Sequence, residues 1–140
     1  MKKLLALLAF AFILPAMASD FPEGSPKFGT SYKAALEQAK TEGKPAILVF
    51  SASWCGPCQA MKKNVYPSKE VTPLHDKFVW AYLDADLEDN ADAMKKYGVE
   101  GIPHIQFVNA EGKAIGTQVG STDPADFAGT LNKMLAKAAK

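Results

Sequence analysis

The chain has 140 residues, 48% of them hydrophobic, which is the size and composition of a single globular domain with one core. The sixteen basic residues are all lysines and face fifteen acidic residues, so the formal net charge is only +1 at pH 7. Planar, two-pronged recognition of phosphate or guanine relies on arginine, so we do not expect nucleic-acid binding. The two cysteines exclude a framework of structural disulfides.

Residues 1–18 have the pattern of a secretory signal peptide. A basic start precedes an apolar run from Leu4 to Leu14, and Ala16 to Ala18 is a small-x-small cleavage site. The alternative is a membrane anchor, but the apolar run is short for a bilayer span. We therefore expect cleavage near Ser19, a periplasmic or secreted location, and no stable membrane anchor after cleavage.

The mature chain is predicted to consist of an extended leader at 19–29, rich in proline and glycine, and one domain at 30–140. In chain order we expect a helix capped at Thr30 or Ser31, a strand from Ala46 to Phe50, a helix carrying Cys58, Met61 and Val65, a strand from Phe78 to Leu83, a helix from Ala91 to Tyr97, strands from His104 to Val108 and from Lys113 to Val119, and a last helix opened by Asp123 and Pro124. This alternation predicts an α/β domain with a central mixed sheet flanked by helices. The acidic segment from Asp84 to Asp92 lacks the glycine and terminal glutamate of a calcium loop, so we interpret it as a solvated loop.

Cys55 and Cys58 are separated by two residues and lie between an apolar strand and a helical pattern. This context is typical of a redox pair. Cys55 is placed at the helix N-terminus, where unpaired N–H groups and the helix dipole favour a thiolate, the attacking form of the thiol. We predict Cys55 as the nucleophile. Cys58 lies one turn further on the core-facing side, and we predict it as the resolving thiol.

The run Trp-Cys-Gly-Pro-Cys, after an apolar strand, resembles the active site of thioredoxins. Gly101-Ile102-Pro103 resembles the cis-proline loop that faces the cysteines in that family. The resemblance implies a thioredoxin fold, disulfide exchange with no cofactor beyond the cysteine pair, and no metal. It also implies that substrate is bound by Trp54, Gly56, Pro57, Ile102 and Pro103.

Three positions depart from the thioredoxin pattern: Val49, Tyr82 and Lys63, the last of which stands where thioredoxins carry a proline that kinks the active-site helix. Thioredoxins carry a buried aspartate six residues before the first cysteine, where this chain has Val49, and the lysine that usually lies beside that acid is replaced by Tyr82. We expect Val49 to lie on the central strand, beneath Cys58 and out of water. The segment from Asn64 to His75 is more similar to the C-terminal domain of the electron transporter DsbD and its small secreted relatives.

For several single residues the sequence allows more than one interpretation. Trp54 is either a core residue or a surface on which substrate docks, and we favour docking. The two cysteines provide half of a zinc or copper(I) site, for which His75 and His104 are the available nitrogen ligands. We expect His75 to be a surface residue on a helix and His104 to begin a strand near the site, turned away from the cysteines.

The sequence therefore predicts an exported thiol–disulfide oxidoreductase that acts through Cys55 and Cys58. We favour a reductase of protein disulfides, because Gly56-Pro57 lacks the histidine that oxidants of the export compartment usually carry between their cysteines. A disulfide oxidant or isomerase and a non-enzymatic copper(I) chaperone are the alternatives. The expected partners are protein disulfides and an upstream thiol electron donor, and we expect a monomer.

Overall fold

The computed structural model describes residues 20–140, so the predicted signal peptide and its cleavage point lie outside the described residues. Within this part, one mixed sheet of five strands has the order β1-β3-β2-β4-β5. The strands are β1 Phe28–Gly29, β2 Ala46–Ser51, β3 Val79–Asp84, β4 His104–Val108 and β5 Ala114–Val119. β1, β3 and β2 run parallel, whereas β4 is antiparallel to β2 and β5 is antiparallel to β4. The predicted α/β class with a central mixed sheet is confirmed.

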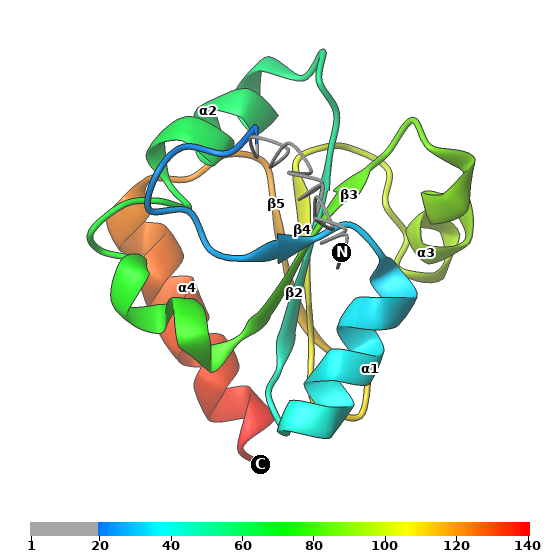
Figure 1. Ribbon diagram of the computed structural model, residues 1–140, viewed down its shortest axis with the longest axis vertical. Helices are drawn as coiled ribbons and strands as arrows, with labels where there is room; N and C mark the ends of the chain where they lie inside the picture. Colours follow the sequence, from blue (N-terminus) through cyan, green and yellow to red (C-terminus); the bar gives the residue numbers. More distant parts are fainter. Residues whose placement is uncertain (1–19) are drawn as a thin grey trace, which may run out of the picture.

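The four α-helices of residues 20–140 cover the sheet in pairs. They are α1 Tyr32–Glu42, α2 Gly56–Asn64, α3 Ala91–Lys96 and α4 Pro124–Ala138, and two 3₁₀ turns lie at Thr72–Lys77 and Glu88–Asn90. Figure 1 shows α2 and α4 on one side of the sheet and α1 and α3 on the other. Among the described residues, no helix combines the length and the apolar character that crossing a membrane requires.

Every residue of β2 is buried, which is expected of a central strand with helices on both faces. Its side chains alternate between two apolar clusters. Val49 packs with Met61 and Phe127 on the face covered by α2 and α4. Leu48 packs with Ala35 on the opposite face, under α1 and α3. The sheet therefore has a core on each face, and β2 fixes the point at which the loop to α2 begins.

The predicted extended leader at 19–29 contributes a strand that the sequence does not indicate. Phe28 and Gly29 form β1 and pair with Trp80 and Ala81 of β3 at the edge of the sheet. Phe28 also stacks on Phe21, with ring centroids 4.7 Å apart. A strand of two residues has no periodicity to recognise, and the surrounding prolines and glycines indicate a loop, so the sequence alone predicts four strands.

Candidate functional site: a disulfide at the start of α2

The two cysteines lie where β2 leads into α2. Cys55 is the N-cap residue of α2, and its Sγ accepts a hydrogen bond of 3.2 Å from the backbone N–H of Cys58. Pro57 occupies the first turn of the helix, where its missing N–H removes no intrahelical bond. The structure joins Cys55 and Cys58 by a disulfide. The helix start therefore presents one sulfur to the unpaired N–H groups of its first turn.

The two cysteines differ less in exposure than their predicted roles suggest. Cys55 is 5% exposed and Cys58 is 1% exposed. Both cysteines pack with Ala52 and the half-buried Ile102 in a small apolar cluster. The cysteines therefore differ mainly in position on the helix: Cys55 caps the N-terminus, and Cys58 lies one turn inside, on the buried side.

Trp54 lies on the surface directly before the cysteine pair. Its side chain is 69% exposed, so the core alternative is wrong. The indole Nε1–H donates a hydrogen bond of 2.8 Å to Oδ2 of Asp86, which holds the ring in place above the surface. The sequence predicts Asp86 only as one more solvated acid of the segment from Asp84 to Asp92. No signal in the sequence links it to Trp54, because the contact crosses between two loops.

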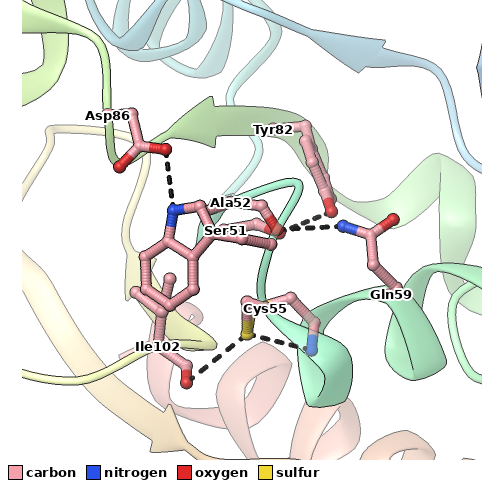
Figure 2. The surroundings of a disulfide bond; sticks show 9 residues. Ser51, Ala52, Cys55, Gln59, Tyr82, Asp86 and Ile102 are labelled. Carbon is pink, nitrogen blue, oxygen red and sulfur yellow. Dashed lines mark hydrogen bonds between the residues drawn. A yellow bond between two sulfur atoms is a disulfide. The ribbon is translucent and has the colours of Figure 1, made fainter.

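The loop before Cys55 is held by hydrogen bonds from three directions. The Ala52 carbonyl accepts from the Cys55 N–H at 3.2 Å and from Gln59 Nε2 at 3.0 Å. The hydroxyl groups of Ser51 and Tyr82 are 2.6 Å apart. Figure 2 shows Tyr82 and Gln59 pointing toward this loop from one side, while Asp86 lies on the other. The sequence by itself indicates no role for Ser51 or Gln59.

The segment before β4 approaches the disulfide from the opposite side. The Ile102 carbonyl oxygen lies 3.8 Å from Cys55 Sγ (Figure 2). The Ile102–Pro103 peptide bond is cis, and the Pro103 carbonyl accepts a hydrogen bond of 2.9 Å from the Gly120 N–H. Pro103 itself is buried, so only the edge of this segment faces the surface.

The structure thus gathers the predicted site residues at one end of the sheet. Gly56 and Pro57 are exposed beside the cysteines, Trp54 is exposed before them, and Ile102 lies half-buried against the disulfide. Together they form an open surface with an almost buried disulfide in its floor. Such a surface suits an extended segment of another protein, which brings its own sulfur to Cys55.

Val49 is completely buried, as predicted, in the apolar cluster that also contains Met61 of α2. It is the register partner of Tyr82 in the parallel pair of β2 and β3. Burial raises the pKa of the Tyr82 hydroxyl above its usual range, an effect opposed by its hydrogen bond with Ser51. Tyr82 therefore stays neutral at physiological pH, and the site has a pair of uncharged hydroxyl groups next to the strand position where thioredoxins carry an acid.

Both histidines bind other groups of the protein. His75, predicted at the surface of a helix, is half-buried on the 3₁₀ turn, and its Nε2 lies 2.7 Å from the Tyr66 carbonyl oxygen. His104 is buried at the start of β4, and its Nε2 lies 3.1 Å from Gln106 Oε1. His104 also packs edge-on against Phe50, on the face covered by α1 and α3, whereas Cys58 belongs to α2 on the other face.

Comparison with known proteins places residues 32–135 in the family described as thioredoxin-like domain. The chloroplastic thioredoxin-like protein HCF164 of Arabidopsis thaliana is 34% identical over 84 residues, which are 60% of this chain and 31% of that protein. The chain thus matches about a third of the length of this curated relative.

The solved structures with the same fold include the following two. A thioredoxin from Thermus thermophilus superposes with a TM-score of 0.71 and 26% identity, covering 78% of this chain and 87% of that one. The oxidised C-terminal domain of DsbD from Neisseria meningitidis superposes with a TM-score of 0.63 and 27% identity, covering 72% of this chain and 90% of that one. The predicted likeness to the C-terminal domain of DsbD is confirmed.

Proposed function

This chain belongs to the thioredoxin-like family, and we propose that it is an exported thiol–disulfide oxidoreductase that reduces disulfide bonds of other proteins. The observation that carries the proposal is the Cys55–Cys58 disulfide at the start of α2, in the floor of an open surface. A disulfide that only stabilises a fold does not require an exposed binding surface beside it. Here Trp54, Gly56 and Pro57 surround the pair and are all exposed.

The reaction has two exchange steps. In the reduced protein the Cys55 thiolate attacks one sulfur of the substrate disulfide, whose bond breaks, and the other substrate sulfur leaves as a thiolate. Cys58 then loses its proton and attacks the Cys55 sulfur of the mixed disulfide, so that the second substrate sulfur leaves. Two electrons pass from the protein to the substrate, and the Cys55–Cys58 bond forms.

The helix start supplies the activation of Cys55. The Cys55 sulfur accepts a hydrogen bond of 3.2 Å from the Cys58 N–H. This N–H lies in the first turn, so it has no carbonyl partner within the helix. Hydrogen bonding and the positive end of the helix dipole both favour the thiolate over the thiol. Cys58, inside the helix and 1% exposed, is suited to the intramolecular second step.

The surrounding residues support an extended substrate. In the proposal, Trp54, Gly56 and Pro57 form the surface under the substrate, and the backbone of Ile102 pairs with it as a short added strand. This is supported by the Ile102 carbonyl oxygen, 3.8 Å from Cys55 Sγ. Pro103 is buried directly after Ile102, and because proline has no backbone N–H, its burial leaves no donor without a partner.

The direction of electron flow follows from the residues between the cysteines. Gly56 and Pro57 carry no group that stabilises the reduced thiolate form, so the disulfide form is favoured and the protein is a reductant. Equilibration with glutathione measures this directly. We expect a potential more negative than about −200 mV, whereas a value near about −120 mV would make the protein an oxidant.

Export follows from the predicted signal peptide at 1–18, and an exported reductant needs an upstream thiol donor that reduces the Cys55–Cys58 bond after each turnover. The proposed partners are therefore a donor dithiol and protein disulfides, and the proposed state is a monomer. Secretion of the full chain and sequencing of the mature N-terminus test the export step. Retention of the uncleaved chain in the cytoplasm would overturn it.

The chemical proposal is tested with Cys58→Ser, which removes the resolving sulfur and stalls the reaction at the mixed disulfide. We expect reduced Cys58→Ser to form a stable covalent adduct with a disulfide-bonded protein, visible on a non-reducing gel and released by dithiothreitol. Cys55→Ser is the matched control and should form no such adduct. Adducts of equal amount in the two variants would overturn the assignment of Cys55 and Cys58.

A further inference from the structure

A groove of about 380 Å³ lies beside the disulfide, on the side of Trp54 that faces Asp86. Its apolar walls are Trp54, Met94, Val99 and Ile102. Met94 and Val99 are half-buried, so part of each side chain is open to the groove. In Figure 2, Asp86 and Ile102 lie on the same side of the active-site loop, opposite Tyr82 and Gln59.

The charged residues of this groove are all acidic. Asp86 and Glu100 line it, both are exposed, and no basic side chain is among the described residues that line it. Asp86 already accepts the Trp54 indole N–H through Oδ2. A carboxylate has lone pairs for several hydrogen bonds, so this contact leaves Asp86 able to accept another donor.

The groove is within reach of a substrate that is bound to Cys55. Ile102 lines the groove, packs against both cysteines, and places its carbonyl oxygen 3.8 Å from Cys55 Sγ. An extended chain advances about 3.3 Å per residue. A substrate segment whose cysteine is joined to Cys55 therefore brings a neighbouring residue to the groove.

We propose that this groove selects substrates with a lysine or arginine next to the reactive cysteine. The proposal rests on the disulfide exchange proposed above and adds the class of substrate. The aliphatic part of the basic side chain packs on Met94 and Val99, its charged end lies between Asp86 and Glu100, and the exposed face of Trp54 attracts the cation. A glutamate side chain at the same place would be repelled by the carboxylates of Asp86 and Glu100.

One exposed ion pair changes a binding constant, or the rate constant of a reaction that depends on binding, by about 1.4- to 5-fold. With attraction for lysine and repulsion for glutamate, we expect reduced protein to react about 3- to 30-fold faster with a lysine peptide than with a glutamate peptide at low ionic strength. Salt screens exposed charges, so the ratio should approach one as ionic strength rises.

The experiment uses three symmetric peptide disulfides that differ only in the residue after cysteine, which is lysine, glutamine or glutamate. The oxidation rate of the reduced protein is followed by tryptophan fluorescence in a stopped-flow instrument. In Glu100→Gln and Asp86→Asn, the lysine-to-glutamate ratio should fall by about 2- to 5-fold each. Asparagine keeps an acceptor for the Trp54 indole.

Glu111→Gln is the matched control, because Glu111 is exposed in the turn between β4 and β5, at the other end of β4 from Pro103. It should leave the ratio unchanged. Equal rates for the three peptides, or an unchanged ratio in Glu100→Gln, would overturn the substrate preference while leaving disulfide exchange intact. A reduced protein that reacts with none of the peptides would instead contradict the proposed function.

Discussion

The hydroxyl groups of Ser51 and Tyr82 lie 2.6 Å apart and join the last residue of β2 to the neighbouring parallel strand β3, two residues before its end. Ser51 is 1% exposed and is the last residue of β2, three residues before Trp54. When a buried hydroxyl loses its hydrogen-bond partner, the free energy of its desolvation is no longer offset. The pair therefore fixes the strand end from which the active-site loop departs.

Tyr82→Phe should lower the free energy of unfolding by about 1–3 kcal/mol, because it keeps the ring but leaves the Ser51 hydroxyl buried without this partner. Ser51→Ala in the same background should then cost little. A double-mutant cycle by urea unfolding should give a coupling of about 0.5–1.5 kcal/mol between the two positions. Additive effects of the two substitutions would show that the contact contributes nothing to stability.

Val49→Asp should be strongly destabilising, because Val49 is completely buried and its register partner is the neutral Tyr82. We expect a loss of about 2–4 kcal/mol at neutral pH from lost apolar burial and a poorly paired polar group. Val49→Ala is the size control and separates the lost packing from the buried carboxyl. A Val49→Asp protein as stable as Val49→Ala would mean that the carboxyl reaches water or a partner.

The destabilisation by Val49→Asp should also depend on pH. Burial raises the pKa of the introduced carboxyl above its unfolded value of about 4, so the folded state binds more protons than the unfolded state between the two pKa values. Stability relative to the parent should then fall as pH rises through that window. Urea unfolding at about pH 4 and about pH 8 should show the larger deficit at the higher pH.

Cys55 should alkylate faster than Cys58 in the reduced protein at neutral pH. The two side chains are 5% and 1% exposed, so the difference should come mainly from thiolate content at the helix N-terminus. Iodoacetamide labelling followed by peptide mass spectrometry measures the order. Equal rates, or faster labelling of Cys58, would contradict the assigned roles.

Tyr66→Phe should leave the protein as stable as the parent or slightly more stable. The Tyr66 side chain is 1% exposed, and its hydroxyl finds no hydrogen-bond partner among residues 20–140. Replacing an unpaired buried hydroxyl by hydrogen removes a desolvation cost. A loss of more than about 1 kcal/mol in urea unfolding would show that the hydroxyl binds a buried water.

The same residue should make the fold sensitive to alkali. Burial raises the pKa of Tyr66 in the folded state, so above the unfolded pKa of about 10 the folded state binds more protons than the unfolded state, and the free energy of unfolding falls as pH rises. Unfolding midpoints at neutral pH and at about pH 11 should show a smaller alkaline loss in Tyr66→Phe than in the parent. An equal loss would assign the alkaline sensitivity to other groups.

The sequence alone predicts the framework because local patterns carry it. The apolar run at 46–50, the helix caps at Ser31 and Asp123, and the Cys-Gly-Pro-Cys spacing each act over a few residues, and the structure has the corresponding strand, caps and helix start. Val49 also lies opposite Tyr82 in the parallel pair of β2 and β3, as the resemblance to thioredoxins implies. Burial of both faces of β2 then follows from its composition.

The tertiary structure decides what depends on contacts between distant segments. β1 exists only because Phe28 meets Trp80 at the sheet edge, and Asp86 becomes part of the site only because its loop passes the Trp54 indole. Likewise, Asp86 and Glu100 line one groove only because the loop after β3 and the loop after α3 come together in the fold. Local propensities fix which elements form, but the charge and shape around the disulfide depend on where packing of the two cores leaves the connecting loops.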